Sequence, residues 1–125
     1  MRSFDHEKLK VYQDSIRFVA WVDELLETVP KPVSVYNQLE RASTSVPLNV
    51  AEGNGKHTSA DRCRFFDTVP GSALECAACL DILLAQGKIE TGVAEKGIKI
   101  KIKSKIKRIQ LFCFSWLKCY LVFRV

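Results

Sequence analysis

The sequence predicts an all-α protein that forms a single domain, residues 1–125. Apolar side chains recur at steps of three and four residues over long stretches, which is the spacing of amphipathic helices. Segments rich in proline or glycine separate these stretches. A chain of 125 residues, 47% hydrophobic and 26% charged, also has the size and composition of one compact domain. We expect helices at about residues 5–27, 33–53, 59–86 and 93–122.

The first helix is predicted by a stripe of apolar residues. Its members are Leu9, Tyr12, Ile16, Val19 and Leu26. Phe18, Trp21 and Leu25 widen the stripe, so we expect this helix to be covered on two sides, for example by another subunit. Two prolines in the segment 28–32 end the helix, because each lacks an N–H and disfavours helical backbone in the residue before it.

The second helix carries a proline in its interior. It begins near Pro32, where a missing N–H costs nothing in the first helical turn. Pro47 lies in the middle of the segment and frees the carbonyl of Ser43, at a cost of roughly 3 kcal/mol if nothing compensates. Either the helix breaks at Val46 or polar neighbours satisfy the freed backbone. We expect a kinked, continuous helix that ends at Gly53 as a left-handed cap.

The third helix has the clearest helical pattern. Thr58, followed by Asp61 three residues later, is typical of an N-terminal capping box. A heptad seam follows, made of Cys63, Phe66, Pro70, Ala73, Ala77, Leu80 and Leu84. Small residues around Gly71 would let a neighbouring backbone approach closely, and the helix should end near Gln86.

The last quarter of the chain has a different character. Isoleucine and lysine alternate from Ile98 to Lys103, and taken alone this alternation has the period of a strand. Over a longer stretch, however, the apolar residues also fall on one face of a helix. A strand would have no partner in a helical chain, so we expect the fourth helix, at about 93–122, with residues 98–125 atypical in sequence. The apolar tail from Ile109 is 17 residues long and contains two cations, which makes it short and interrupted for a membrane span.

Charge is divided unevenly along the chain. Residues 1–95 contain ten Lys/Arg and fourteen Asp/Glu, whereas residues 96–125 contain nine Lys/Arg and no acid. A segment with a net charge of +9 favours an anionic partner such as nucleic acid. The candidate nucleic-acid-binding residues are Lys96, Lys99, Lys101, Lys103, Lys105, Lys107 and Arg108. The competing interpretations are a solvated lysine face that only keeps the protein soluble and, less favoured, membrane or protein binding helped by the aromatic tail.

The cysteines predict free thiols rather than a metal centre. They are Cys63, Cys76, Cys79, Cys113 and Cys119. The charged N-terminal segment has no secretory hydrophobic region, so we expect a cytoplasmic protein with reduced cysteines. Cys76 and Cys79 have CxxC spacing, but a closed zinc site needs four converging ligands and the chain has only two histidines. No metal and no cofactor are predicted.

One pair of motifs is specific enough to suggest a family. The second helix contains QLxRAxxSVPxNVAEGxGK and the third contains FFxxxxGSxxE. With these motifs, residues 8–84 resemble the small bacterial four-helix-bundle proteins encoded within intervening sequences of 23S ribosomal RNA genes. Those proteins are similar to the accessory variability determinant proteins of diversity-generating retroelements. The motif positions of interest are Arg41, Ser45, Pro47, Asn49, Glu52, Gly53, Gly71 and Glu75.

The resemblance has implications for fold and partners. It implies an antiparallel up-and-down four-helix bundle that assembles into a homo-oligomeric ring, typically a pentamer. It also implies binding of nucleic acid or of a nucleoprotein through a basic surface, and no enzymatic activity. The chain departs from the family pattern at Val69-Pro70, where members usually have Ala-Arg, and in the lysine–isoleucine alternation of its last quarter.

The polar motif residues have two interpretations. Near a proline kink, side chains such as Arg41 and Asn49 most often satisfy freed backbone groups or one another, and a partner-binding groove is the alternative. Glu52 and Glu75 are a carboxylate pair, but no nucleophile, histidine or metal ligand accompanies them, so an enzyme is not expected. The favoured hypothesis is a non-catalytic homo-oligomer that binds rRNA or a retroelement-like RNA or DNA. The alternative is an oligomeric protein-interaction scaffold without direct nucleic-acid binding.

Overall fold

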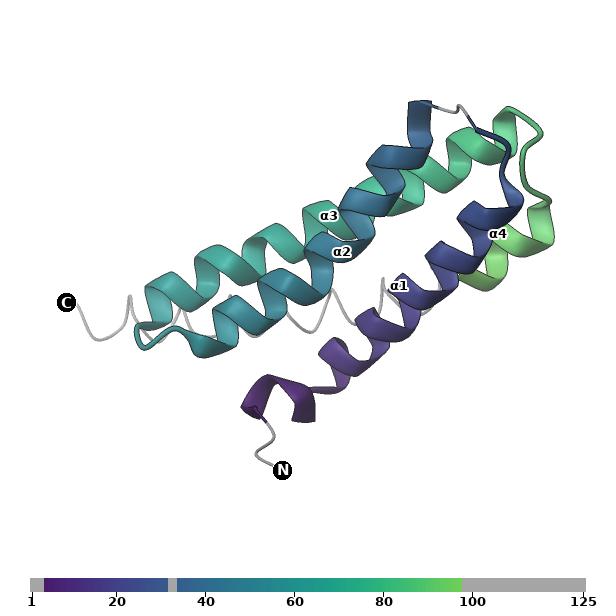
Figure 1. The fold of residues 1–125 in the computed structure, drawn as a ribbon. Coiled ribbons are helices and arrows are strands. Elements are labelled where there is room, and N and C mark those ends of the chain that lie inside the picture. The colour runs from purple at the N-terminus through teal and green to yellow at the C-terminus, as the bar shows by residue number, and fades with distance from the viewer. Residues whose placement is uncertain (1–3, 32–33, 98–125) are drawn as a thin grey trace.

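A computed structural model describes residues 4–31 and 34–97 of the chain, and every regular element in these ranges is helical. The elements are the short 3₁₀ helix η1 (Asp5–Lys8) and the helices α1 (Lys10–Thr28), α2 (Ser34–Gly55), α3 (Ser59–Ala85) and α4 (Thr91–Gly97). Helices α1, α2 and α3 run antiparallel in an up-and-down arrangement, and α4 turns back after α3 (Figure 1). The predicted all-α bundle is therefore confirmed. The part of the predicted fourth helix from residue 98 on lies outside the described residues.

The first predicted helix is two elements rather than one. Residues 5–8 form a 3₁₀ turn, which is capped by the Glu7 carboxylate accepting a hydrogen bond from the N–H of Phe4 at 3.2 Å. Leu9 then has extended backbone, with φ −74° and ψ 123°, and α1 starts after it. The break turns the Leu9 side chain onto an apolar cluster of α2 and α3. A continuous helix from residue 5, as the periodicity predicted, was wrong for this packing reason.

Helix α2 passes through Pro47 without a break, so the predicted continuous helix is confirmed. It extends two residues beyond the predicted end, to Gly55, before a short link to α3. Thr58 caps α3 as predicted, because its Oγ1 accepts a hydrogen bond from the N–H of Asp61 at 3.2 Å. Helix α3 is likewise continuous through Pro70.

The end of α3 is a glycine-dependent turn near the predicted position. Gly87 has φ +66°, the left-handed conformation that glycine adopts without strain. The N–H of Lys88 donates to the carbonyl of Leu83 at 2.9 Å, and the N–H of Gly87 donates to that of Leu84 at 3.0 Å. This pair of bonds is a Schellman motif. It satisfies the last carbonyls of α3 and directs the chain into α4.

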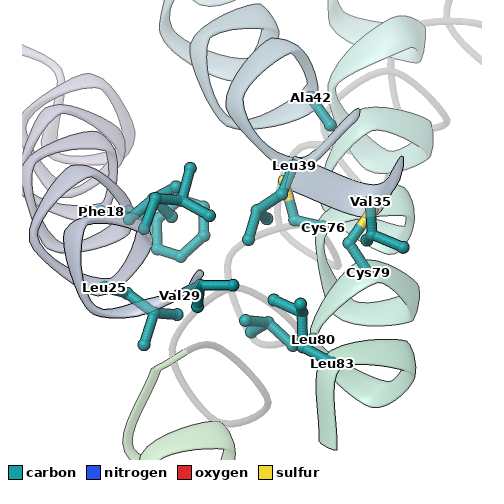
Figure 2. Packing of buried hydrophobic residues seen from close by; sticks show 12 residues of the cluster. Phe18, Leu25, Val29, Val35, Leu39, Ala42, Cys76, Cys79, Leu80 and Leu83 are labelled. Carbon is teal, nitrogen blue, oxygen red and sulfur yellow. The ribbon is translucent and has the colours of Figure 1, made fainter. Parts of the chain in front are cut away.

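The main core joins α1, α2 and α3 near the α1–α2 connection. Figure 2 shows side chains from the three helices pointing toward one another in this cluster. Its buried members are Phe18, Val22, Leu25, Leu26, Val29, Val35, Leu39, Ala42, Cys76, Cys79, Leu80 and Leu83. Leu39 and Leu83 have no exposed surface. Burial of this apolar area is the dominant stabilising term for the bundle.

The buried stripe of α3 differs from the predicted heptad seam. It follows Val69, Ala73, Cys76, Leu80 and Leu83, whereas Phe66, Ala77 and Leu84 of the predicted seam are only partly buried. Both stripes are apolar, so periodicity alone cannot choose between them. The helix is also long and apolar enough to cross a membrane by length and composition, with mean hydropathy 1.4 over its best window. A core helix of a bundle passes the same test.

Candidate functional site between α2 and α3

Ser45, Asn49 and Ser72 form a hydrogen-bonded cluster between α2 and α3. The hydroxyl oxygens of Ser45 and Ser72 lie 2.9 Å apart and share a hydrogen bond across the two helices. Asn49 Nδ2 donates to Ser45 Oγ at 3.0 Å and to the Ser45 carbonyl at 2.8 Å. Ser72 is buried, and the other two residues are half-buried. The cluster links the QLxRA…GK motif of α2 to the FF…GS motif of α3.

The cluster supports the structural interpretation of Asn49. Its amide satisfies a backbone carbonyl close to Pro47, as expected for a polar residue near a helical proline. The carbonyl is that of Ser45 rather than the Ser43 carbonyl that we expected Pro47 to free. The Asn49 amide nitrogen is engaged by Ser45 through both contacts. Its Oδ1 has no hydrogen-bond partner among the described residues, and it can only accept.

Gly53 does not act as a left-handed cap, so that prediction was wrong. Within the described ranges, Gly87 alone has a positive φ. Gly53 is buried inside α2, and a Cβ there would lie 2.7 Å from Phe66 Cε1 and 3.1 Å from Phe65 Cβ. The missing side chain lets the two phenylalanines of α3 pack directly on the α2 backbone. Gly53 is therefore a close-packing glycine.

Pro47 is buried within α2, and the other four motif residues lie on the surface. Arg41, Glu52, Gly71 and Glu75 are exposed. In the described part of the chain, none of the three charged ones takes part in an ion pair within 4 Å. Ser45 faces Ser72 on antiparallel helices, so Glu52 lies level with residue 65 of α3. Glu75 is about ten helical residues further along α3, which is roughly 15 Å along the bundle. The two carboxylates are too far apart to act on one proton.

An open groove of about 450 Å³ lies beside the cluster, near the connection from α2 to α3. Its lining residues are Asn49, Lys56, Asp61, Arg64, Phe65 and Thr68. Lys56 Nζ lies 4.8 Å from the centroid of the Phe65 ring, a cation–π contact. One carboxylate oxygen of Asp61 accepts a hydrogen bond from the Thr58 hydroxyl at 2.6 Å. The groove thus combines one aromatic ring, two exposed cations and a carboxamide acceptor.

Sequence analysis did not identify this groove. Lys56 and Phe65 belong to the two family motifs, and Arg64 directly precedes Phe65. No local sequence pattern marks any of the three as a site residue. Three link residues join α2 to α3. A link this short fixes an antiparallel register in which residues 49–56 face residues 61–68. This register could have predicted the groove from the sequence, but only if α2 is known to continue past Gly53.

Cys76 and Cys79 belong to the main core. Both thiols lie on the side of α3 that faces Val35 and Leu39 of α2 (Figure 2). Burial, then the nearby Cys79 and Glu75, raise the pKa of Cys76 to about 12, and burial followed by Glu75 raises the pKa of Cys79. Among the described residues, no three His, Cys, Asp or Glu side chains come together as metal ligands would. The CxxC pair is therefore explained by core packing.

The motif geometry gives the resemblance a physical basis, since Gly53 packs on Phe66 and Ser45 bonds to Ser72. A family model described as 23S rRNA-intervening sequence protein matches residues 7–110. The chain belongs to this family. The match begins in η1 and continues past Arg108, so it also covers the lysine-rich run. No curated protein matches the chain.

The lysine-rich run of this family member is not part of the described surface. Lys96 lies in α4, but its side chain is outside what the structure describes. The other six candidates, from Lys99 to Arg108, fall in residues 98–125 and lie outside the described ranges as well. Their assignment as nucleic-acid-binding residues stays a prediction.

Proposed function

We propose that this 23S rRNA-intervening sequence protein is a non-catalytic, cytoplasmic homo-oligomer that binds nucleic acid, rRNA or a retroelement-like RNA or DNA, through its basic C-terminal segment. The observation that carries the proposal is the division of charge. The bundle portion, residues 1–95, has a net charge of −4, whereas residues 96–125 have a net charge of +9. A polyanion is repelled by the first part and attracted by the second, so binding concentrates on the lysine-rich run.

Oligomerisation, with a pentamer as the expected state, is supported by an exposed apolar face on α3. Leu74 is 60% exposed and Ile82 is 41% exposed. Gly71 lies near Leu74 on this helix, with open space where a Cβ would be. A second copy of the chain could cover these side chains and approach the helix closely at Gly71. Repeating the basic segment around a ring would multiply its attraction for phosphates.

The test is a binding titration with the full chain and two charge variants. In the first variant, Lys99, Lys101, Lys103 and Lys105 are replaced by Gln; in the matched control, Lys8, Lys10, Lys31 and Lys88 are replaced by Gln. Each variant loses four positive charges. We expect the wild type to bind single-stranded RNA with a steep salt dependence. Loss of four phosphate contacts would lower the magnitude of the slope of log K against log salt concentration by about 3 in the first variant. The control variant should keep most of the slope.

The alternative is an oligomeric protein-interaction scaffold. It is favoured by the same exposed face of α3 and needs no nucleic acid. Assembly in sedimentation experiments together with no RNA or DNA binding at low salt would select the scaffold and reject the proposed function. Replacement of Leu74 by Lys should dissociate the oligomer in either case. The equivalent change at Leu48, which is also 60% exposed but lies on α2, is the matched control and should leave the oligomer intact.

A further inference from the structure

We propose that the groove between α2 and α3, lined by Asn49, Lys56, Asp61, Arg64, Phe65 and Thr68, binds one nucleotide unit of a single-stranded nucleic acid. This inference rests on the proposed function, and it adds a second, base-contacting site on the bundle itself. The lysine-rich run supplies attraction for phosphates that is independent of the base. The groove supplies a contact with the base.

The Phe65 ring is the stacking surface of this site. The ring lines the groove and is only half-buried. Lys56 Nζ stands over it at 4.8 Å, so one face of the ring is covered by the end of an exposed lysine side chain rather than by the core. Lys56 is itself exposed and flexible, so a base can take its place on the ring while the ammonium moves to the adjoining phosphate. Gly53 holds the ring's position, because Phe65 Cβ packs against it.

The polar lining matches the remaining parts of a nucleotide. Arg64 is exposed beside Phe65 and offers a guanidinium to the phosphate. Asn49 presents Oδ1 as an acceptor, since its amide nitrogen is engaged by Ser45. An acceptor can receive a hydrogen bond from the exocyclic amino group of cytosine or from the N3–H of uracil, so it adds a contact with the base. Asp61 is held by Thr58, and its carboxylate limits the net positive charge of the groove to about that of one cation.

The experiment compares two oligonucleotides on the full chain. One is a short oligocytidine, and the other is an abasic sugar–phosphate chain of the same length. Both carry the same phosphates, so the lysine-rich run attracts them equally. We expect the wild type to bind the oligocytidine roughly five-fold or more tightly than the abasic chain, the lower end of what stacking on an aromatic residue contributes. An oligouridine, which also carries a base that can stack and a donor at N3, should likewise bind more tightly than the abasic chain.

Three variants test whether the preference for oligocytidine over the abasic chain depends on Phe65. Phe65→Leu should bind both chains equally, because it keeps an apolar side chain but removes the ring. Phe65→Tyr should keep the preference for the oligocytidine. Tyr36→Leu is the matched control, since Tyr36 is also half-buried and carries a lysine, Lys31, at 4.5 Å from its ring centroid. It lies at the other end of α2 and should leave the preference unchanged.

The outcomes separate this inference from the proposed function. Equal binding of both chains by the wild type, or a preference that survives in Phe65→Leu, would overturn the groove assignment while nucleic-acid binding stands. No binding of either chain at low salt would overturn the proposed function and the groove together. Equal binding of both chains by the unmodified protein would overturn the groove assignment whether or not Phe65→Leu folds, and the variants place a preference, once found, at Phe65.

Discussion

The two ends of the α2–α3 pair are built differently. Near the α1–α2 connection, large aliphatic side chains such as Leu39, Leu80 and Leu83 fill a core shared by three helices. Near the α2–α3 connection, the buried cluster is small, with Val46, Val50, Val69 and Ala73 as its buried members. Serine hydroxyls, a carboxamide and a glycine make the helix contacts there instead. The first end holds the bundle together, and the second holds two helices close while it leaves a polar groove open.

The largest expected effect is at the apolar end. Replacing Leu39, which has no exposed surface, by Ala should lower the free energy of unfolding by about 2–5 kcal/mol, the range for leucine-to-alanine changes in packed cores. Leu48→Ala on the same helix is the control and should change it by less than about 0.5 kcal/mol, because Leu48 is 60% exposed. Chemical denaturation measures both. Similar losses at the two positions would contradict the placement of the core.

A smaller effect is expected at Gly53, near the α2–α3 connection. Its sign is opposite to the one that helix propensity predicts. Helix propensity alone predicts that Gly53→Ala stabilises α2 by up to about 1 kcal/mol. The new Cβ would lie 2.7 Å from Phe66, and overpacking typically costs about 1–3 kcal/mol, so we expect a net loss of stability. Gly55→Ala is the control, because nothing lies within 4 Å of its Cβ position. A gain in stability at Gly53 would mean that the phenylalanines do not pack on this backbone.

Near neutral pH the smallest expected effect is that of the core thiols, because their contribution changes only in alkaline solution. The pKa of Cys76 is raised from 9.0 to about 12, so between these values the unfolded chain releases a proton that the folded chain retains. The free energy of unfolding should therefore fall as pH rises through this window, and it should be insensitive to this group below pH 9. Thermal melts of wild type and Cys76→Ala measure the difference. Cys63→Ala, at a half-buried position outside the main core, is the matched cysteine-to-alanine variant for this comparison.

Periodicity predicted α2 and α3 as helices, but not the break at Leu9 or how the helices pack. The α2–α3 pair, the Thr58 cap and the end of α3 follow from local patterns that each segment carries alone. Gly53 shows where local reasoning fails. A glycine near a helix end suits either a left-handed cap or a close contact, and here the choice depends on Phe66, a residue on the next helix.

The candidate site was predicted in part. The motif indicated that Ser45 and Asn49 matter, and the structure joins them to Ser72. The groove depends on residues from two helices in a fixed register, which no single pattern encodes. The break at Leu9 is likewise hidden in the sequence, because the apolar spacing continues through it, whereas in the structure Leu9 packs on a cluster of α2 and α3.

Photo-crosslinking tests the central claim most directly. A single-stranded RNA with a photoreactive base is crosslinked to the full chain, which is then cut after glutamate. Residues 96–125 contain no acid, so cleavage after Glu95 releases the basic segment intact, and cleavage after Glu52 and Glu75 releases residues 53–75, which carry Lys56, Arg64 and Phe65. We predict crosslinks in these two fragments, and loss of the crosslink in residues 53–75 for Phe65→Leu. Crosslinks confined to other fragments, such as those of α1, would contradict the account.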